Sequence, residues 1–443
     1  MFSNKDLRKL IIPLVIEQLL AVTIGMADTV MVSSCGEAAV SGISLVDSIN
    51  FLLITLFSSL ATGGAVIASQ YIGRGDHKSA SLAAKQLFYA SLALSAVLGV
   101  IAVFFRKPVL NIVFGSIEAD VMAHAQIYFL LSAISYPFLA VYNAGAALFR
   151  SMGDSRTTML ISILMNTINI VGNAILIYGF QMAAAGAATA SLVSRAVGAI
   201  IITVLLLNPR RIIFYDKLHK PEIHLSMLKS ILQIGVPNGL ENSIFQIGKI
   251  LVASIVSGFG TISITANAVA GNLASLQVIP GMALGMAMIT VVGQCIGAKD
   301  YEAVKKYTKK LMLITYGVVW AMTLLMLLFS KQILSFYSLS EETTTMTMEV
   351  FIVHGICAVI VWPLAFALPN ALRAANDVRF TMIVSLLSMW IFRIGFSYIL
   401  AIYFNMGILG TWIAMCIDWF CRGACFVIRF ARGKWKNISF IDN

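Results

Sequence analysis

The sequence predicts an all-α polytopic membrane protein with twelve transmembrane helices in two pseudo-symmetric six-helix lobes. Three observations predict this fold: the composition, a series of long apolar segments, and an internal repeat. Of the 443 residues, 59% are apolar and only 12% are charged, and the mean hydropathy is +0.89. Soluble proteins carry roughly 25% charged residues. The composition therefore excludes a soluble globular protein, a disordered chain and a disulfide-stapled secreted domain.

The apolar segments have the length and the pattern of membrane helices. A spanning helix needs about 20 mostly apolar residues. Runs such as 92–105 and 315–329 are apolar on all sides, whereas the strands of a β-barrel would alternate apolar and polar residues. Turn-like breaks separate the segments. The predicted spans are 8–32, 46–72, 84–105, 122–147, 157–178, 185–207, 228–257, 268–295, 310–329, 346–371, 380–403 and 408–430.

The distribution of positive charge predicts the orientation of these spans. Of the 31 lysines and arginines, 24 fall at the two ends of the chain or in one set of loops, three fall in the opposite loops, and four lie inside spans. Positively charged loops stay in the cytoplasm. We therefore expect a multi-pass protein of the cell membrane with both termini cytoplasmic. The net charge of +11 then reflects topology and contact with membrane lipid, and not binding of nucleic acid.

The chain is also a repeat of itself. A shift of 224 or 223 positions brings four stretches of the first half onto four stretches of the second, in the same order. The matched stretches are 13–17 with 237–241, 70–76 with 294–300, 150–156 with 373–379, and 182–186 with 406–410. Because six spans is an even number, the two halves share one orientation, which makes a parallel repeat. We predict lobes at 1–215 and 216–443, with a basic linker at 208–224.

Parallel six-helix halves are a transporter architecture, in which substrate passes between two lobes. An enzyme should instead show a constellation of His, Asp or Cys residues. Here the five histidines are scattered, and the six cysteines have no metal-ligand spacing. We therefore expect a transporter of a small molecule that acts as a monomer and not an enzyme, without a cofactor, a metal site or a disulfide.

Ionisable residues inside the spans are candidate functional groups, because burying them in a membrane costs several kcal/mol. Glu17 and Asp28 lie eleven residues apart on the first span. That spacing puts them ~20° from a common face and ~16 Å apart along the helix axis, so both can line one cavity at different depths. Asn169 and Asn173 share a face of the fifth span. Position 252, the repeat equivalent of Asp28, is Val, so we expect the coupling carboxylate in the first lobe.

The second lobe carries charges of both signs, which should be paired at this depth. We expect Asp418 to pair with Arg393 or Arg422, and Glu241 with Lys249 or Arg393. Two interpretations stay open: a structural network that stabilises the lobe, or a substrate or proton site. The candidate cavity or proton-path residues of the two lobes are Glu17, Glu241, Lys249, Arg393 and Asp418.

Several short motifs, taken in order, resemble one family of transporters. They are 25–32 (Gly-Met-Ala-Asp-Thr-Val-Met-Val), 70–73 (Gln-Tyr-Ile-Gly), 150–156 (Arg-Ser-Met-Gly-Asp-Ser-Arg), 169–173 (Asn-Ile-Val-Gly-Asn), 178–179 (Tyr-Gly) and 186–191 (Gly-Ala-Ala-Thr-Ala-Ser). Over essentially its whole length the chain resembles the multidrug and toxic compound extrusion (MATE) transporters.

The resemblance implies cation-coupled efflux by alternating access, in which Na⁺ or H⁺ is exchanged for organic, often cationic, amphipathic compounds. It implies that Asp28 is the coupling carboxylate, that Asn169 and Asn173 occupy two functional positions of helix 5, and that Ser191 matches a hydroxyl of helix 6. Asn173 departs from the aspartate that some members carry at its position.

The chemistry of this set permits either coupling ion. Carboxylate, amide and hydroxyl oxygens suit a hard cation such as Na⁺, and a carboxylate can equally carry a proton. An alternative function is a lipid-linked oligosaccharide flippase of the same superfamily, which would need a basic central cavity for a pyrophosphate. A second alternative is a non-transporting membrane scaffold or sensor, which would not need the embedded acids.

Overall fold

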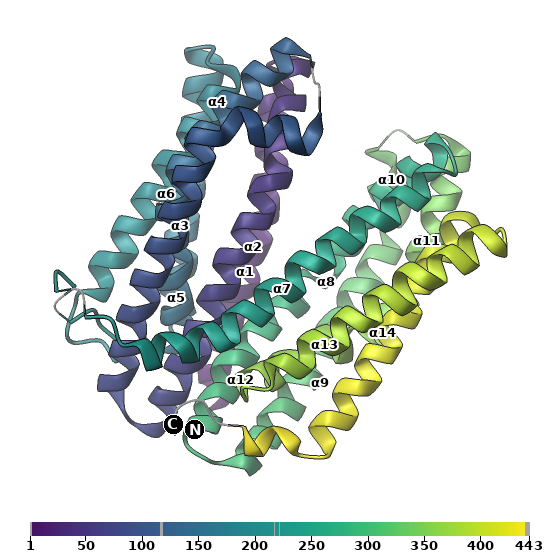
Figure 1. Ribbon diagram of the computed structural model, residues 1–443. Coiled ribbons are helices and arrows are strands. Elements are labelled where there is room, and N and C mark those ends of the chain that lie inside the picture. Colours follow the sequence, from purple (N-terminus) through teal and green to yellow (C-terminus); the bar gives the residue numbers. More distant parts are fainter. Residues whose placement is uncertain (1, 116–117, 217, 221, 338, 439–443) are drawn as a thin grey trace. The chain divides into compact units, whose positions relative to one another are not determined.

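The computed structural model describes residues 2–115, 118–216, 218–220, 222–337 and 339–438 (Figure 1). The side chains of residues 23–29 lie outside the described residues, and Asp28 is among them. Over the described residues the chain forms helices and turns, and no strand is present there.

The first half of the chain forms six long helices, purple to teal in Figure 1. They are α1 (Asn4–Ser33), α2 (Glu37–Arg74), α3 (His77–Phe114), α4 (Ala119–Ser151), α5 (Ser155–Asn173), which continues as the π-helix η1 (Ala174–Gly179), and α6 (Ala183–Leu206).

The second half repeats this series with more breaks, because two of its spans change from α-helix to π-helix along their length. Its elements are α7 (Leu225–Ser257), α8 (Thr261–Gly297), α9 (Tyr301–Leu328), α10 (Ser330–Ser335), α11 (Glu341–Ile360), η2 (Pro363–Ala367), α12 (Leu368–Ala374), α13 (Val378–Ser388), η3 (Met389–Gly395), η4 (Tyr398–Tyr403), α14 (Gly407–Ala431) and the 3₁₀-helix η5 (Lys434–Asn437).

The twelve predicted spans coincide with these helices, and the predicted fold class is confirmed. Among the described residues, eleven helices are long and apolar enough to cross a membrane, and α1 supplies the remaining span. Several helices start earlier than predicted; α2, for example, begins at Glu37 and not at residue 46. Hydropathy marks the part of a helix that faces lipid, whereas the helix itself continues through small and polar residues beyond it.

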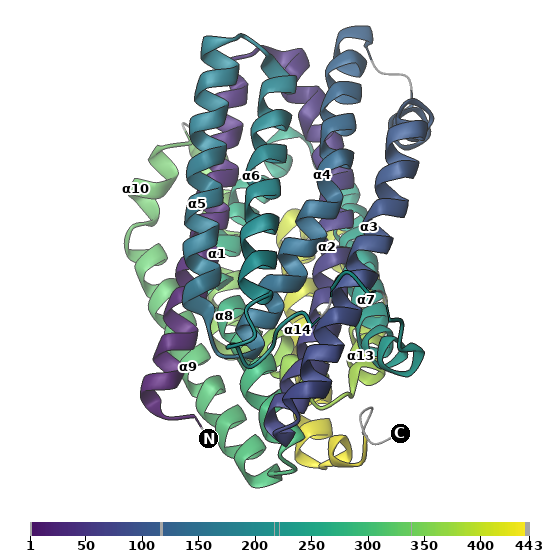
Figure 2. The same ribbon diagram turned by 90° about the vertical axis from the view of Figure 1, so that its left-hand side faces the viewer.

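The chain divides into two compact units, residues 1–239 and 240–443. In the first, α4 packs against α2, α3 and α6, and α5 packs between α1 and α6, as the neighbouring ribbons in Figure 2 show. Its core includes Val46, Phe57, Phe129 and Tyr136. In the second, α8 packs against α9, α11 and α12, and α14 packs against η2, η3 and η4. Each unit thus has a helical core of its own.

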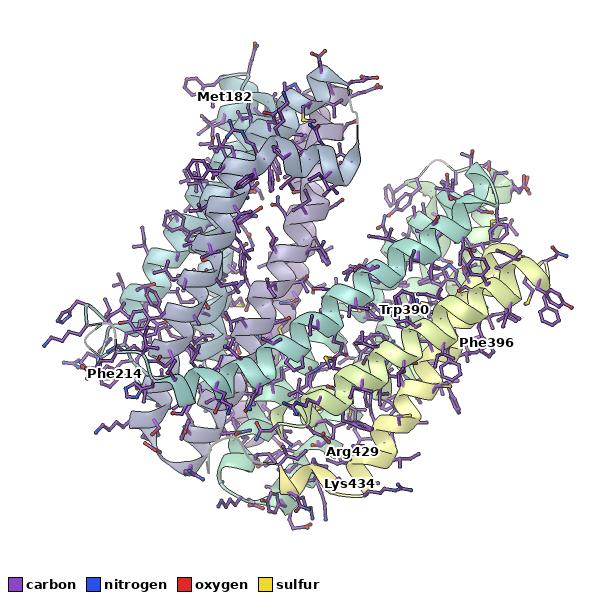
Figure 3. All side chains as sticks on the ribbon, in the orientation of Figure 1. Met182, Phe214, Trp390, Phe396, Arg429 and Lys434 are labelled. Atoms are coloured by element: carbon purple, nitrogen blue, oxygen red, sulfur yellow. The ribbon has the colours of Figure 1, made fainter. Side chains whose placement is uncertain are left out.

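The segment between α6 and α7 is fastened to the first unit. The side chain of Gln86 on α3 donates to the carbonyl of Glu222 at 2.7 Å and accepts from the backbone N–H of His224 at 3.0 Å. Phe214 of this segment and Met182, in the turn before α6, lie at opposite ends of the unit (Figure 3). The predicted lobe boundary falls within this segment.

The repeat extends to the backbone itself. Left-handed backbone positions recur at equivalent places in the two halves. The pairs are Gly36 with Gly260, Gly75 with Lys299, Gly153 with Asn376, Gln181 with Asn405, and Ala183 with Gly407. The π-helices η1 and η4, which end the fifth long helix of each half, are related by the same shift. Of the left-handed residues in the described chain, only Gly115 and Gly433 have no counterpart.

One pair of equivalent glycines shows why the same residue type is needed in both halves. A Cβ atom on Gly186 of α6 would lie 3.2 Å from the carbonyl carbon of Leu176 in η1. A Cβ atom on the equivalent Gly410 of α14 would lie 2.7 Å from the backbone nitrogen of Ala401 in η4. The first turn of the last helix in each unit therefore packs directly on the π-helix before it, and any larger residue would push the two apart.

The aspartates of the repeated motifs begin helices. Asp76, Asp154 and Asp300 are the N-caps of α3, α5 and α9, and each side chain accepts a hydrogen bond from the backbone N–H three residues later. Hydrogen bonds from Ser79 hold the pKa of Asp76 below its usual range. An N-cap bond satisfies one of the free N–H groups at a helix start. The motif is thus a turn and cap, and not a binding loop.

Candidate functional site

Three of the four predicted cation-coupling residues meet inside the first unit. The side-chain N–H of Asn169 donates to the hydroxyl of Ser191 at 3.1 Å, and that of Asn173 donates to the amide oxygen of Asn169 at 3.5 Å. Asn169 and Asn173 are buried, at 5% and 1% exposure. The fourth residue, Asp28, has its side chain outside the described residues. The geometry thus brings together a hydrogen-bonded cluster of neutral polar side chains, of which Ser191 is partly buried.

The local sequence explains why these residues meet. Asn169 and Asn173 are one turn apart on α5, so they project from the same face. The facing segment of α6 is rich in small residues, and a Cβ atom on Gly172 would lie 2.9 Å from that of Ala190. Small residues allow helices in a membrane to approach closely. The two helices are therefore near enough for side chains as short as Asn and Ser to bond directly.

Glu17 connects three helices of the first unit. One carboxylate oxygen lies 3.4 Å from a guanidinium nitrogen of Arg150 at the end of α4. The other accepts a hydrogen bond from the hydroxyl of Thr158 on α5 at 2.9 Å. Glu17 is buried, at 7% exposure. The carboxylate thus joins α1 to the end of α4 and the start of α5.

The second unit contains the equivalent pair. Glu241 on α7 lies 2.7 Å from one terminal guanidinium nitrogen of Arg373. The second terminal nitrogen of Arg373 donates to the amide oxygen of Asn370 at 2.9 Å. The predicted pairing of Glu241 with Lys249 or Arg393 was wrong. The reason is that 363–374, predicted as the end of a span followed by a loop arginine, folds as η2 and α12, and the last turn of α12 returns Arg373 to the bundle.

The repeat itself contained the signal for this pair. Glu241 matches Glu17 and Arg373 matches Arg150 in the shifted sequence. Both units therefore use one carboxylate–guanidinium pair to join their first helix to the end of their fourth span.

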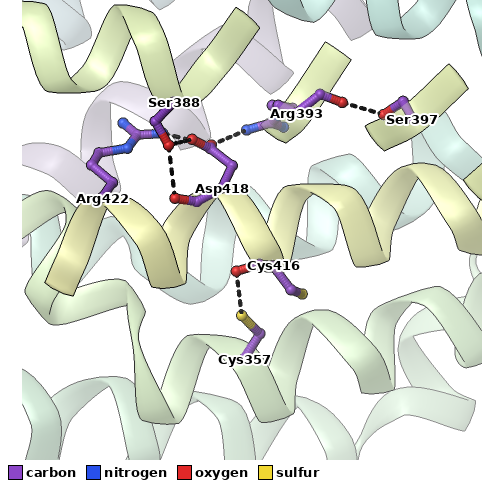
Figure 4. Close-up of polar contacts among 7 residues, drawn as sticks. All are labelled: Cys357, Ser388, Arg393, Ser397, Cys416, Asp418 and Arg422. Atoms are coloured by element: carbon purple, nitrogen blue, oxygen red, sulfur yellow. Dashed lines mark hydrogen bonds and ion pairs between the residues drawn. The ribbon is translucent and has the colours of Figure 1, made fainter. Parts of the chain in front are cut away.

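A second buried charge cluster lies on α14 and the helices beside it (Figure 4). Asp418 is fully buried and accepts a bond from Arg422 at 2.7 Å. The same carboxylate oxygen lies 3.9 Å from a guanidinium nitrogen of Arg393 on η3, and the hydroxyl of Ser388 donates to the other oxygen. The predicted pairing of Asp418 is confirmed with both arginines. One carboxylate thus stands between two buried cations.

A third cation joins this cluster through an aromatic ring. The charged groups of Lys249, Arg393 and Arg422 lie 5.5, 5.4 and 5.3 Å from the ring centre of Phe245. Arg422 also lies 4.9 Å from the ring centre of Phe366. Lys249 is exposed, and among the described residues no carboxylate pairs with it. We call these residues, with Asp418, the Phe245 cluster.

Sequence reasoning missed a buried histidine. His354, taken as one of five scattered histidines, is 3% exposed and shares a hydrogen bond of 2.9 Å with Gln277. Gln277 in turn donates to Thr323, and the rings of Trp412 and Trp419 flank the imidazole. Polar residues at apolar positions of three different spans were the available signal. The hydrogen bond to Gln277 satisfies the polar imidazole inside the core, as a structural histidine requires.

The first unit has a further polar network around α2. Asp47 is exposed, accepts a hydrogen bond from Tyr128 at 3.0 Å and one from Asn50 at 3.2 Å. Arg195 donates to Ser135 at 2.7 Å on the neighbouring α4.

All six cysteines are free thiols. In the described part of the chain, no group of three or more His, Cys, Asp or Glu residues could hold a metal ion.

The two halves of the chain match one family model separately. The model described as MatE matches residues 13–175 and again residues 237–399. The chain belongs to the MatE family. Both limits of the two MatE matches are related by a shift of 224, the same shift that relates the sequence motifs and the π-helices. The family model therefore describes one lobe, and this chain contains two.

Relatives match the chain over nearly its full length. The chain is 26% identical over 442 residues to a probable multidrug resistance protein NorM of Thermotoga maritima, covering 98% of this chain and 93% of that protein. It is 28% identical to the uncharacterized transporter YisQ of Bacillus subtilis, covering 96% and 93%. A solved structure described as the outward-facing conformation of a multidrug resistance MATE family transporter shares the fold, with a TM-score of 0.89, 20% identity, and 98% and 97% coverage.

These findings establish the general class of the protein. It is a multi-pass membrane protein of a transporter family, with the two-lobe fold of MatE transporters.

Proposed function

We propose that this protein is a secondary active exporter that exchanges Na⁺ or H⁺ for amphipathic organic compounds by alternating access. It acts as a monomer in the cell membrane. Both termini lie in the cytoplasm, as the positive charge of one set of loops indicates. It carries out no chemical reaction on its substrate and needs no cofactor besides the transported ion. The observation that carries this proposal is the hydrogen-bonded Asn169–Ser191 group in a chain of the MatE family.

Helix geometry supports including Asp28 in this group. Glu17 of α1 bonds to Thr158 of α5. Four chain reversals separate the two helices, so they run in the same direction. Position 28 is eleven residues beyond Glu17, and Asn169 is eleven residues beyond Thr158. Since every residue advances a helix by about 1.5 Å, we expect position 28 to stand level with Asn169.

The combined group has the chemistry of a cation site. A carboxylate at position 28 adds one negative charge to the neutral oxygens of Asn169, Asn173 and Ser191. Hard cations take such oxygen ligands, and a proton can occupy the carboxylate instead. The ion drives transport only as far as it binds the outward-open and inward-open states with different affinities. Organic cations of amphipathic character are the substrates that the family resemblance implies.

The variant Asp28→Asn tests this assignment. It keeps the size of the side chain and removes the negative charge, so we expect efflux to be abolished while the protein still accumulates in the membrane. Efflux of a fluorescent dye from cells and the amount of protein in the membrane fraction are the two measurements. Full export by this variant would refute the coupling role of Asp28.

Asp47→Asn is the matched control. It removes an equal charge from a helix of the same unit, at a side chain held by Tyr128 and Asn50. We expect efflux close to that of the unaltered protein. If both variants are equally inactive, the loss of any acid in the unit is sufficient to abolish efflux, and the specific assignment to Asp28 fails.

A further inference from the structure

We propose that the Phe245 cluster of the second unit binds the anionic group of the transported substrate. The site would take an aromatic compound that carries a carboxylate or a similar anion, either alone or beside a positive charge. This inference rests on the proposed export function and names a substrate class for it.

The charge balance of the cluster is the first argument. Lys249, Arg393 and Arg422 surround one ring, within 5.5 Å of its centre, so any two of the cationic groups lie within twice that distance. Asp418 is the one carboxylate paired with them in the described chain. Three positive charges thus face a single negative charge. An excess of charge at membrane depth is costly and marks a functional site by default.

Glu241, the nearest glutamate along α7, does not neutralise this excess of positive charge. Glu241 is already paired with Arg373 at 2.7 Å. A carboxylate committed to one guanidinium at that distance leaves Lys249 uncompensated. Among the described residues no carboxylate then pairs with Lys249, and an anion bound beside its exposed side chain would balance the charge of the cluster.

Unused hydrogen-bond donors are the second argument. The Nε atoms of both Arg393 and Arg422 are buried, and neither has a hydrogen-bond partner among the described residues. The residues themselves are 9% and 2% exposed. A buried donor without a partner costs free energy that an acceptor would recover. Arginine in particular binds carboxylates and related anions through several N–H groups at once.

The surroundings indicate what kind of molecule carries the anion. The ring centre of Phe366 lies 6.3 Å from that of Phe245 and 5.4 Å from that of Trp419, and both ring pairs pack edge to face. Lys249, whose side chain is exposed, gives the cluster an accessible side. Aromatic walls with a few placed charges are typical of sites for small organic ligands. An aromatic body with an acidic substituent fits both features.

Two dyes that differ in one group provide the test. Rhodamine B has a free carboxylate, and its ethyl ester has the same aromatic body and positive charge without it. We would measure binding of both dyes by fluorescence polarisation to the full-length protein in phosphatidylcholine nanodiscs. We expect rhodamine B to bind about tenfold more tightly than the ester. Equal binding of the two dyes would overturn the proposal.

The variant Lys249→Met tests the site itself, because this exposed side chain can change without disturbing the fold. We expect it to remove most of the preference for rhodamine B and to leave binding of the ester unchanged. Lys305→Met removes an equal charge from an exposed lysine paired with Glu302 outside the cluster, and it should keep the preference. A preference that survives Lys249→Met would also overturn the proposal.

A lipid headgroup could supply the same anion, so the measurement is repeated with phosphatidylglycerol in the nanodiscs. If the preference disappears there, the cluster binds an anionic lipid and the assignment to substrate is wrong. If it persists, substrate is the ligand. Because binding is measured without transport, loss of coupling at Asp28 would leave these results unchanged, and the two proposals fail separately.

Discussion

Replacing Asp418 by Asn is expected to destabilise the second unit by about 3–5 kcal/mol, the usual effect of breaking a buried ion pair. The carboxylate is fully buried between Arg393 and Arg422. Without it, two guanidinium groups remain in the core beside Lys249 with no negative charge to offset them. The midpoint of thermal unfolding of the purified protein should fall by on the order of 10 °C.

Asp377→Asn is the comparison for this result. Asp377 also pairs with an arginine, Arg429, through bonds of 2.6 and 3.0 Å. Arg429 lies at the end of α14, where its side chain is 21% exposed. Water can therefore solvate it when the partner is lost, and we expect a smaller drop in the unfolding midpoint. Equal drops for the two variants would contradict the view that Asp418 stabilises a buried excess of positive charge.

Replacing Arg373 by Met should have an effect of similar size, again about 3–5 kcal/mol. The substitution leaves the carboxylate of Glu241, whose side chain is 8% exposed, without its partner at 2.7 Å. It also removes the bond that holds Asn370. The expected result is a protein that accumulates poorly and unfolds at a lower temperature in a thermal-shift measurement.

Adding Glu241→Gln to the same protein provides the control. If the loss comes from an uncompensated charge, the neutral amide should recover most of the stability. A double variant as unstable as Arg373→Met alone would show that the arginine acts by packing and not by pairing.

The overall fold could be predicted because lipid imposes strong constraints on a sequence. Every spanning segment must be apolar and helical, so composition and turn residues located all twelve spans. The repeat could be predicted for a similar reason. Positions such as Gly186 and Gly410 permit one close packing arrangement, and the caps Asp76 and Asp300 begin equivalent helices, so the same residues recur in both halves.

The partners of the embedded charges could be predicted only in part. Asp418 and Arg422 are four residues apart on one helix, so their contact follows from helix geometry. Glu241 and Arg373 are 132 residues apart, and their contact depends on how the fourth span of the unit bends back through η2 and α12. Hydropathy does not report such bends, because the π-helical segment is as apolar as the α-helix around it.

The polar cluster of the first unit shows the same division. One-turn spacing predicts that Asn169 and Asn173 share a face, and their bond agrees with it. The contact of Asn169 with Ser191 depends on the close approach of α5 and α6, which the family resemblance indicated and the residue pattern alone did not.

The most direct test of the account is dye transport by the purified protein in liposomes, with a Na⁺ gradient and a pH gradient imposed separately. Rhodamine B and its ethyl ester would be used in parallel, so that the outcome does not depend on the charge of the substrate. The account predicts that one of the two gradients drives dye movement, and that Asp28→Asn abolishes it. If neither gradient moves either dye, the protein is not a cation-coupled exporter of such compounds.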